Sequence, residues 1–308
     1  KSCVGESPPW VQIPPVPRGD FARHRNTPTP KGNTLKMTKI FSIGEMSPRV
    51  SVVIAAYNSS ARLRCAVISA LEQSFSPLEV IVVGDGCTDD SEEVMLGLRD
   101  ARIRWENMPS NWGEQSRASN RGVELAMGEY IFFLNQDDLW LTNHVEDSLS
   151  VLEKQGVDVI WSPYVVAREG VRPGERITPR GLARKHPHFD PYTFIPASCT
   201  AWRAASIRKI GGWRTAAEIS VSPSQDLLWR AKERGLMIQG KASPSVVVLW
   251  SGQRPGSYLP GYKPRDNEAW LEEILTRPGL IREQIEGVVA NRMRKLTSSN
   301  MELNSCGN

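Results

Sequence analysis

Two adjacent acids follow an apolar segment of the chain, a position where side chains that do chemistry are often found. Asn135, Gln136, Asp137 and Asp138 come directly after the apolar residues 130–134. Neighbouring carboxylates repel each other and lose hydration when they are buried, so they are a costly way to end a core strand. A turn followed by a helix cap would also use aspartate here. The segment alone leaves a turn and a functional site as open alternatives.

Polar residues also follow two other apolar runs. These are "AAYN" (55–58) and "GDGCTDD" (84–90). Ligands of open α/β sheets bind at the carboxyl ends of the strands, so the three polar clusters predict one shared site. Taken singly, Gly84-Asp85-Gly86 could be a tight turn and Tyr57 a packed aromatic. A dinucleotide-binding motif is excluded, because Asp89 stands where G-x-G-x-x-G requires its third glycine.

The elements that must position these residues alternate along the chain. Short apolar, β-branched runs predict strands at 50–56, 79–84, 102–107, 130–135, 157–161 and 245–250. Segments with apolar residues three and four apart lie between the first five runs and predict helices. Asn143 and Glu146 have the spacing of a capping box. A further helix is expected over 224–235, and 266–295 should be helical. This rhythm predicts a mostly parallel α/β sheet.

Composition restricts the class of protein. The formal net charge is +4 over 308 residues, and no long Lys/Arg run indicates nucleic-acid binding. The five cysteines are far apart and indicate free thiols in a reducing compartment. No apolar run has the roughly 18 residues that cross a bilayer, and no signal peptide is apparent. The sequence therefore predicts a cytoplasmic protein.

The proline-rich residues 1–47 have no sustained apolar period and predict a disordered or peripheral leader. We expect deletion of residues 1–45 to leave stability nearly unchanged.

Three segments together resemble one known family. They are "VSVVIAAYN" (50–58), "EVIVVGDGCTDDS" (79–91) and "NWGEQSRASNRGVELAMGEYIFFLNQDDLW" (111–140). In order, spacing and strand context they resemble the inverting family 2 glycosyltransferases over residues 48–250. The resemblance implies the GT-A fold, with a mostly parallel central sheet and helices on both faces. It also implies a nucleotide-sugar-binding half (48–160), an acceptor and catalytic-base half (161–250), and a flap with a C-terminal helical segment (251–308).

The resemblance implies site residues as well. Nucleotide binding would fall to Ala56, Tyr57, Asp85, Arg117, Asn135 and Gln136. Asp85 would accept an N–H of the base, and Arg117 would contact ribose or phosphate, although a solvated helix arginine is an equal alternative. The family's D-x-D motif implies that Asp137 and Asp138 hold Mn²⁺ or Mg²⁺ on the donor diphosphate. Asn135 and Gly84 stand where acids are usual, so a weakened site is expected.

The resemblance also implies a catalytic base. Family members carry an acid pair after a Gly-Gly corner, and here Gly211-Gly212 precedes Gln225-Asp226. Asp226 matches the base that takes the acceptor proton, while Gln225 replaces the acid before it. The alternative for Asp226 is a first-turn acid favoured by the helix dipole.

The implied partners are a UDP-, GDP- or TDP-sugar and a saccharide, lipid-linked or small-molecule acceptor, which allows peripheral contact with the inner face of the membrane. The basic segment "RGLARKHPHFD" (180–190), with His186 and His188, could face an anionic acceptor or be a solvated loop. Arg254 in the flap segment 250–258 could supply charge near the diphosphate.

Three other functions are alternatives to glycosyl transfer. Gly84, Asn135 and Gln225 would suit a degenerate sugar-nucleotide-binding protein without turnover. A nucleotidylyltransferase should carry a Gly-rich phosphate loop after the first strand, and "AAYNSSARLR" (55–64) is not one. A glycosidase with two carboxylates is disfavoured by the parallel-sheet order.

Overall fold

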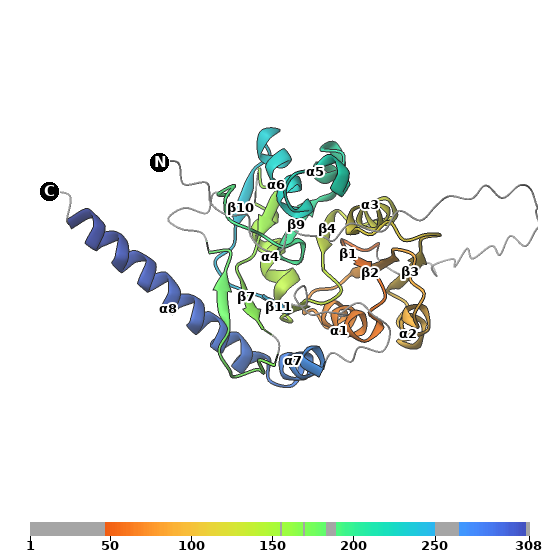
Figure 1. Ribbon diagram of the computed structural model, residues 1–308, viewed down its shortest axis with the longest axis horizontal. Coiled ribbons are helices and arrows are strands. Elements are labelled where there is room, and N and C mark those ends of the chain that lie inside the picture. Colours follow the sequence, from red (N-terminus) through yellow and green to blue (C-terminus); the bar gives the residue numbers. More distant parts are fainter. Residues whose placement is uncertain (1–46, 155, 169, 183–188, 250–264, 306–308) are drawn as a thin grey trace, which may run out of the picture. The chain divides into compact units, whose positions relative to one another are not determined.

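The computed structural model describes residues 47–154, 156–168, 170–182, 189–249 and 265–305 (Figure 1). Residues 47–308 form one compact unit. The leader 1–46 lies outside the described residues, so its peripheral character stays a prediction. In the described part of the chain, no helix combines the length and the apolar character that crossing a bilayer requires.

The central sheet has seven strands in the order β10-β6-β9-β4-β1-β2-β3. All neighbours pair in parallel except β9, which is antiparallel to both β4 and β6. The strands are β1 (Val50–Ala56), β2 (Leu78–Gly84), β3 (Ile103–Asn107), β4 (Tyr130–Phe133), β6 (Val159–Trp161), β9 (Thr200–Arg203) and β10 (Ile238–Gly240). The α/β class with a mostly parallel sheet, expected from the sequence, is confirmed.

Helices cover both faces of this sheet. In Figure 1, α1 and α2 lie on one side of β1–β3, and α3 lies on the other, against β1 and β2. A Cβ at Gly122 of α3 would lie 2.3 Å from a Val53 methyl, so glycine permits this close approach of helix and strand. The helices are α1 (Ser60–Leu71), α2 (Ser91–Gly97), α3 (Gln115–Leu125), α4 (His144–Leu152), α5 (Ala204–Lys209), α6 (Pro223–Glu233), α7 (Arg265–Thr276) and α8 (Pro278–Ser305).

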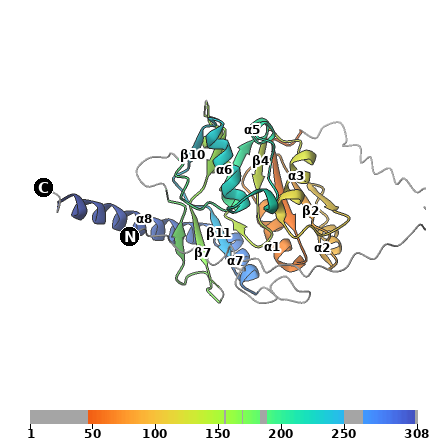
Figure 2. The same cartoon turned by 45° about the horizontal axis from the view of Figure 1, so that its top comes forward.

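A smaller, four-stranded sheet has the order β5-β11-β7-β8. Its strands are β5 (Leu139–Trp140), β11 (Val246–Leu249), β7 (Tyr164–Ala167) and β8 (Thr178–Arg180). A second apolar cluster joins this sheet to α7 and to the first half of α8, with Trp270 and Ile285 fully buried. The later part of α8 extends away from both sheets in both views (Figures 1 and 2).

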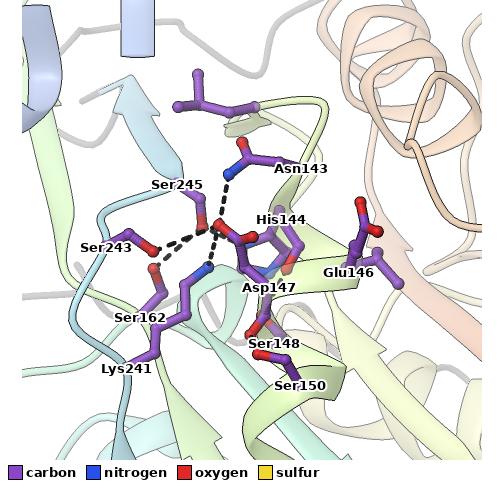
Figure 3. A network of polar contacts seen from close by, with 12 residues as sticks. Asn143, His144, Glu146, Asp147, Ser148, Ser150, Ser162, Lys241, Ser243 and Ser245 are labelled. Atoms are coloured by element: carbon purple, nitrogen blue, oxygen red, sulfur yellow. Dashed lines mark hydrogen bonds and ion pairs between the residues drawn. The ribbon is translucent and has the colours of Figure 1, made fainter. Parts of the chain in front are cut away.

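The predicted capping box at the start of α4 is wrong. Asn143 is the N-cap residue, but it makes no side-chain cap; its amide donates to the Asp147 carboxylate four residues on. Glu146 instead accepts a hydrogen bond from Ser74 Oγ at 2.7 Å. The Asn143 side chain thus bonds Asp147 instead of capping the helix. Asp147 belongs to a polar network that also contains the buried Lys241 (Figure 3).

Candidate active site

The ends of β1, β2 and β4 are tied together by backbone and amide hydrogen bonds. Gln136 Oε1 accepts from Tyr57 N at 2.8 Å, and Gln136 Nε2 donates to Tyr57 O at 3.1 Å. Asp85 N donates to Ala56 O at 2.7 Å. The three polar clusters therefore meet at one edge of the sheet, as the sequence predicts. Both the oxygen and the nitrogen of the Gln136 amide are hydrogen-bonded to the Tyr57 backbone. The side chain therefore joins two strand ends rather than facing a ligand.

Asp85 anchors the segment that follows β3. The residue is 4% exposed, and its carboxylate accepts hydrogen bonds from the backbone N–H groups of Trp112 and Gly113, each at 3.1 Å. Burial raises the pKa of Asp85, and these N–H donors counteract part of the rise. A carboxylate has about four lone-pair positions, so it can accept a further donor such as a base N–H.

Arg117 and Trp112 form a pair beside this anchor. The Arg117 guanidinium lies 3.9 Å from the centre of the Trp112 ring, and both side chains are exposed. Such stacking holds a cation and an aromatic face in one orientation. The exposed Trp112 was not selected from the sequence, although an aromatic next to glycine in a segment after a strand is a signal that could have found it.

The glycine at position 84 has a steric reason. A Cβ there would lie 2.5 Å from Asn107 Oδ1. The Asn107 amide fills this space and bonds both backbone groups of Cys87, at 2.9 Å each. The neutral Asn107 amide thus occupies the space beside position 84, where the family resemblance implies an acid.

Asp138 is a buried acid with three hydrogen-bond donors. It is 2% exposed; Oδ2 accepts from Ser198 Oγ at 2.5 Å and Asn135 Nδ2 at 3.0 Å, and Oδ1 accepts from Leu249 N at 3.3 Å. Burial, and then the neighbouring Asp137, raise the pKa of Asp138 well above its usual range, and the donors only partly offset this. Both oxygens of Asp138 are engaged within the protein. This arrangement does not fit the metal-ligand role that the resemblance implied for Asp138.

Asp137 is the less buried residue of the pair. It is half-buried, and its backbone oxygen accepts a hydrogen bond from Asn267 Nδ2 at 3.0 Å. Among the described residues, no group of three His, Cys, Asp or Glu side chains could hold a metal ion. Mg²⁺ and Mn²⁺ in nucleotide sites commonly take one or two carboxylates together with phosphate oxygens and water. The residues present fit a cation bound together with a diphosphate, and they do not fit one held by protein alone.

Asp226 lies in the first turn of α6 and connects that helix to the Gly-Gly corner. Its Oδ2 accepts from Arg230 Nε at 2.7 Å, and its Oδ1 lies 3.6 Å from the exposed Arg214. Arg230 also donates to the carbonyls of Ile210 and Gly212. Asp226 Oδ1 is therefore the oxygen on the side of the exposed Arg214, while Oδ2 is held by the buried Arg230.

The corner itself lies next to β4. Trp213 packs edge-on against Phe133, the last residue of β4, with ring centres 4.9 Å apart. Gln225, which replaces an acid, donates to Pro191 O at 2.7 Å and so has a structural partner of its own. His186, His188 and Arg254, which the sequence linked to acceptor or donor charge, lie outside the described residues.

Ser198, Leu249 and Asn267 contact the acid pair and were missed by sequence reasoning. They come from segments 60, 111 and 130 residues away from the acids they bond. No local pattern marks them, since their hydrogen bonds to this segment are created only by the tertiary fold.

Comparison with known families decides the identity of the chain. Residues 51–211, just over half of its length, match the model of "Glycosyl transferase family 2". The chain belongs to glycosyl transferase family 2.

Two relatives are 32–33% identical to part of this family 2 chain. The first is the UDP-Glc:α-D-GlcNAc-diphosphoundecaprenol β-1,3-glucosyltransferase WfaP of Escherichia coli, 32% identical over 126 residues, 41% of this chain and 49% of the relative. The second is the glycosyltransferase GlyG of Streptococcus pneumoniae serotype 4, 33% identical over 121 residues, 39% of this chain and 40% of the relative. The chain spans less than half of the length of either relative.

Solved structures agree with this family 2 fold. S. aureus TarS 1-349 in complex with UDP-GlcNAc has a TM-score of 0.56 at 18% identity, over 74% of this chain and 67% of the other. The mannosyltransferase PcManGT of Pyrobaculum calidifontis in complex with GDP-Man and Mn²⁺ has a TM-score of 0.55 at 15% identity, over 84% and 81%. These likenesses confirm the expected GT-A architecture.

Proposed function

We propose that this chain transfers a sugar, with inversion, from a nucleotide-sugar donor to an acceptor hydroxyl. The observation that supports it most is the meeting of Asp85, Tyr57 and Asp137 at the joined ends of β1, β2 and β4. The structural neighbours are complexes with UDP-GlcNAc and with GDP-Man and Mn²⁺, which makes a UDP- or GDP-sugar the first donor to test.

Asp137 is the residue that would hold a divalent cation against the donor diphosphate. When bound, such a cation supplies positive charge that stabilises the leaving nucleoside diphosphate. Asp138 helps to fix the backbone next to Asp137, because its own carboxylate is hydrogen-bonded to Ser198 and Asn135. Asp85 orients the donor by accepting an N–H of the base while it holds the segment after β3 in place.

Asp226 would act as the general base. Oδ2 is held by Arg230, so the carboxylate keeps one orientation, and Oδ1 can accept the proton of the acceptor hydroxyl as that oxygen attacks the sugar. In an inverting displacement the attack comes from the side opposite the leaving diphosphate. The base therefore has to stand on the acceptor side.

A lipid-linked acceptor is the class that the relatives favour. WfaP, and WfgD of Escherichia coli at 25% identity, are both named as acting on α-D-GlcNAc-diphosphoundecaprenol. Transfer to such an acceptor would bring the chain to a membrane surface.

A nucleotide-sugar-binding protein without turnover is the second candidate, because Gly84, Asn135 and Gln225 replace acids. A thermal-shift screen with UDP, GDP, TDP and their sugars, with and without Mn²⁺, separates the possibilities. A nucleotide at 100 times its Kd should raise the stability of the folded state by about 2.7 kcal/mol. Stabilisation by one base class together with donor hydrolysis supports transfer, and stabilisation without hydrolysis supports binding alone. A screen without any hit would contradict both.

A further inference from the structure

The C-terminal part of the chain contacts the acid pair at two points. Leu249 N, at the end of β11, donates to Asp138 Oδ1 at 3.3 Å, and Asn267 Nδ2, in α7, donates to Asp137 O at 3.0 Å. Both residues lie beyond position 211, where the family match ends. The segment that carries Asp137 is thus held by residues outside the region that defines the family.

Asn267 is a rigid donor. It is 2% exposed, and the same helix buries Trp270, Leu271 and Ile274 in the second apolar cluster. Helix α7 also lies against α1 and against β5, the strand that begins directly after Asp138. A helix fixed on several sides can hold its side-chain donor in one place.

The carbonyl that Asn267 binds belongs to a turn that is outside the sheet ladders. β4 ends at Phe133 and β5 begins at Leu139; between them, Asp138 N donates to Asn135 O at 3.2 Å. A hydrogen bond to the Asp137 carbonyl fixes the peptide plane between the two acids. The direction of the Asp137 side chain follows from that plane, because the backbone limits which rotamers are allowed.

We propose that Asn267 is a positioning residue that orients Asp137 for the cation–diphosphate complex of the donor. The inference rests on the role proposed for Asp137. Removing Asn267 leaves the Asp137 carbonyl without this donor and lets the peptide plane rotate. Outer-shell partners of metal ligands typically account for about 10–100-fold in metal affinity, which sets the scale of the expected effect.

The test compares two substitutions in the same helix of the full chain. Asn267→Leu removes the donor to Asp137 at similar volume. Trp270→Phe is the matched control, because it also removes a side-chain N–H donor from a backbone carbonyl. Trp270 Nε1 donates to Val171 O at 2.9 Å, and Val171 lies in the β7–β8 connection. Two quantities are measured. The first is the melting temperature. The second is the Mn²⁺ affinity in the presence of UDP or GDP, obtained from a titration monitored by electron paramagnetic resonance.

We expect Asn267→Leu to weaken Mn²⁺ binding by about tenfold or more. Trp270→Phe should lower the melting temperature comparably and leave Mn²⁺ affinity within about twofold. Asn267→Gln, which keeps an amide donor, should retain more affinity than Asn267→Leu and gives a second variant if the leucine protein fails to fold. Equal Mn²⁺ affinity in the leucine and Trp270→Phe proteins, or equal loss in the leucine and glutamine proteins, would overturn the role of Asn267. A wild-type protein without Mn²⁺-dependent nucleotide binding would overturn the proposed function as well.

Discussion

Asn135 shows how one residue can depart from a family pattern and still serve the site. Its amide donates to Asp138 Oδ2 at 3.0 Å, so it stabilises a buried acid that has Asp137 beside it. An aspartate at position 135 would replace this amide donor with a carboxylate, next to two acids and in a place with little solvent. The sequence predicted that these three residues belong together, but it could not predict Ser198, which lies 63 residues beyond Asn135 in the chain.

The Asn135→Asp substitution should have effects of opposite sign without and with a divalent cation. Without Mn²⁺, the substitution removes the hydrogen bond to Asp138 and adds a carboxylate beside the acid pair, so the free energy of unfolding should fall by about 1–3 kcal/mol. With Mn²⁺ and a nucleotide, the added oxygen ligand should give a larger rise in melting temperature than in the wild type. Asn135→Ala, which loses the bond and adds no charge, is the control. A rise no larger than that of the alanine variant would argue against a cation here.

The contact between α4 and the β10–β11 connection is built from polar residues inside the fold. Lys241 lies 3.9 Å from Asp147, and Ser243 Oγ also donates to Asp147 (Figure 3). His144 Nδ1 and Ser245 Oγ are 2.7 Å apart in the same network. Burial lowers the pKa of Lys241 to about 8. A charged amine in this position therefore costs the folded state free energy at neutral pH.

The pH dependence of stability should reveal this amine. Between pH 8 and 10.5 the unfolded chain keeps the Lys241 proton that the folded protein has lost, so the unfolded state binds more protons. Wild-type stability relative to Lys241→Met should therefore rise with pH across this window, by roughly 3 kcal/mol for the full shift. Denaturant unfolding at several pH values measures it, with Lys209→Met, an exposed lysine, as control. A constant difference between wild type and Lys241→Met would contradict this assignment.

The elements differ in how well their sequences predicted them. β1, β2 and β4 are apolar on both faces, which is the pattern of buried parallel strands, and each lies within two residues of its predicted bounds. Five strands of the described chain were not predicted: β5, β7, β8, β9 and β10. Each has four residues or fewer, and β5 and β9 pair with strands far along the chain. Such short segments have no readable period, so only the completed fold specifies them.

Helix α7 and the start of α8 are part of the core. They bury Trp270, Leu271, Ile274, Ile281 and Ile285 against the smaller sheet. The sequence predicted helices here but gave no indication of what they cover. The packing surface comes from β5, β7 and β11, whose association the sequence did not predict.

Truncation should therefore affect the two ends of the chain differently. A protein of residues 47–264 would lose five large buried side chains worth about 1.5–3 kcal/mol each, a total comparable with the stability of a whole domain. We expect it not to fold. The matched protein of residues 47–308 should melt within a few degrees of the full chain. Circular dichroism melting of both measures this, and a cooperative transition in the shorter protein would contradict the role given to α7 and α8.

Asp226 is the residue proposed to remove the acceptor proton during transfer from a nucleotide sugar. The most direct test measures donor Kd and transfer rate on the same preparations of wild type, Asp226→Asn and Glu233→Gln, an exposed acid on the same helix. Asparagine keeps the shape of the side chain and cannot take the proton. Donor Kd should stay within about threefold while transfer falls by about 10²-fold or more, and Glu233→Gln should behave as the wild type. Transfer that is unchanged in Asp226→Asn, or that falls only in step with donor binding, would contradict the role of Asp226 as the base.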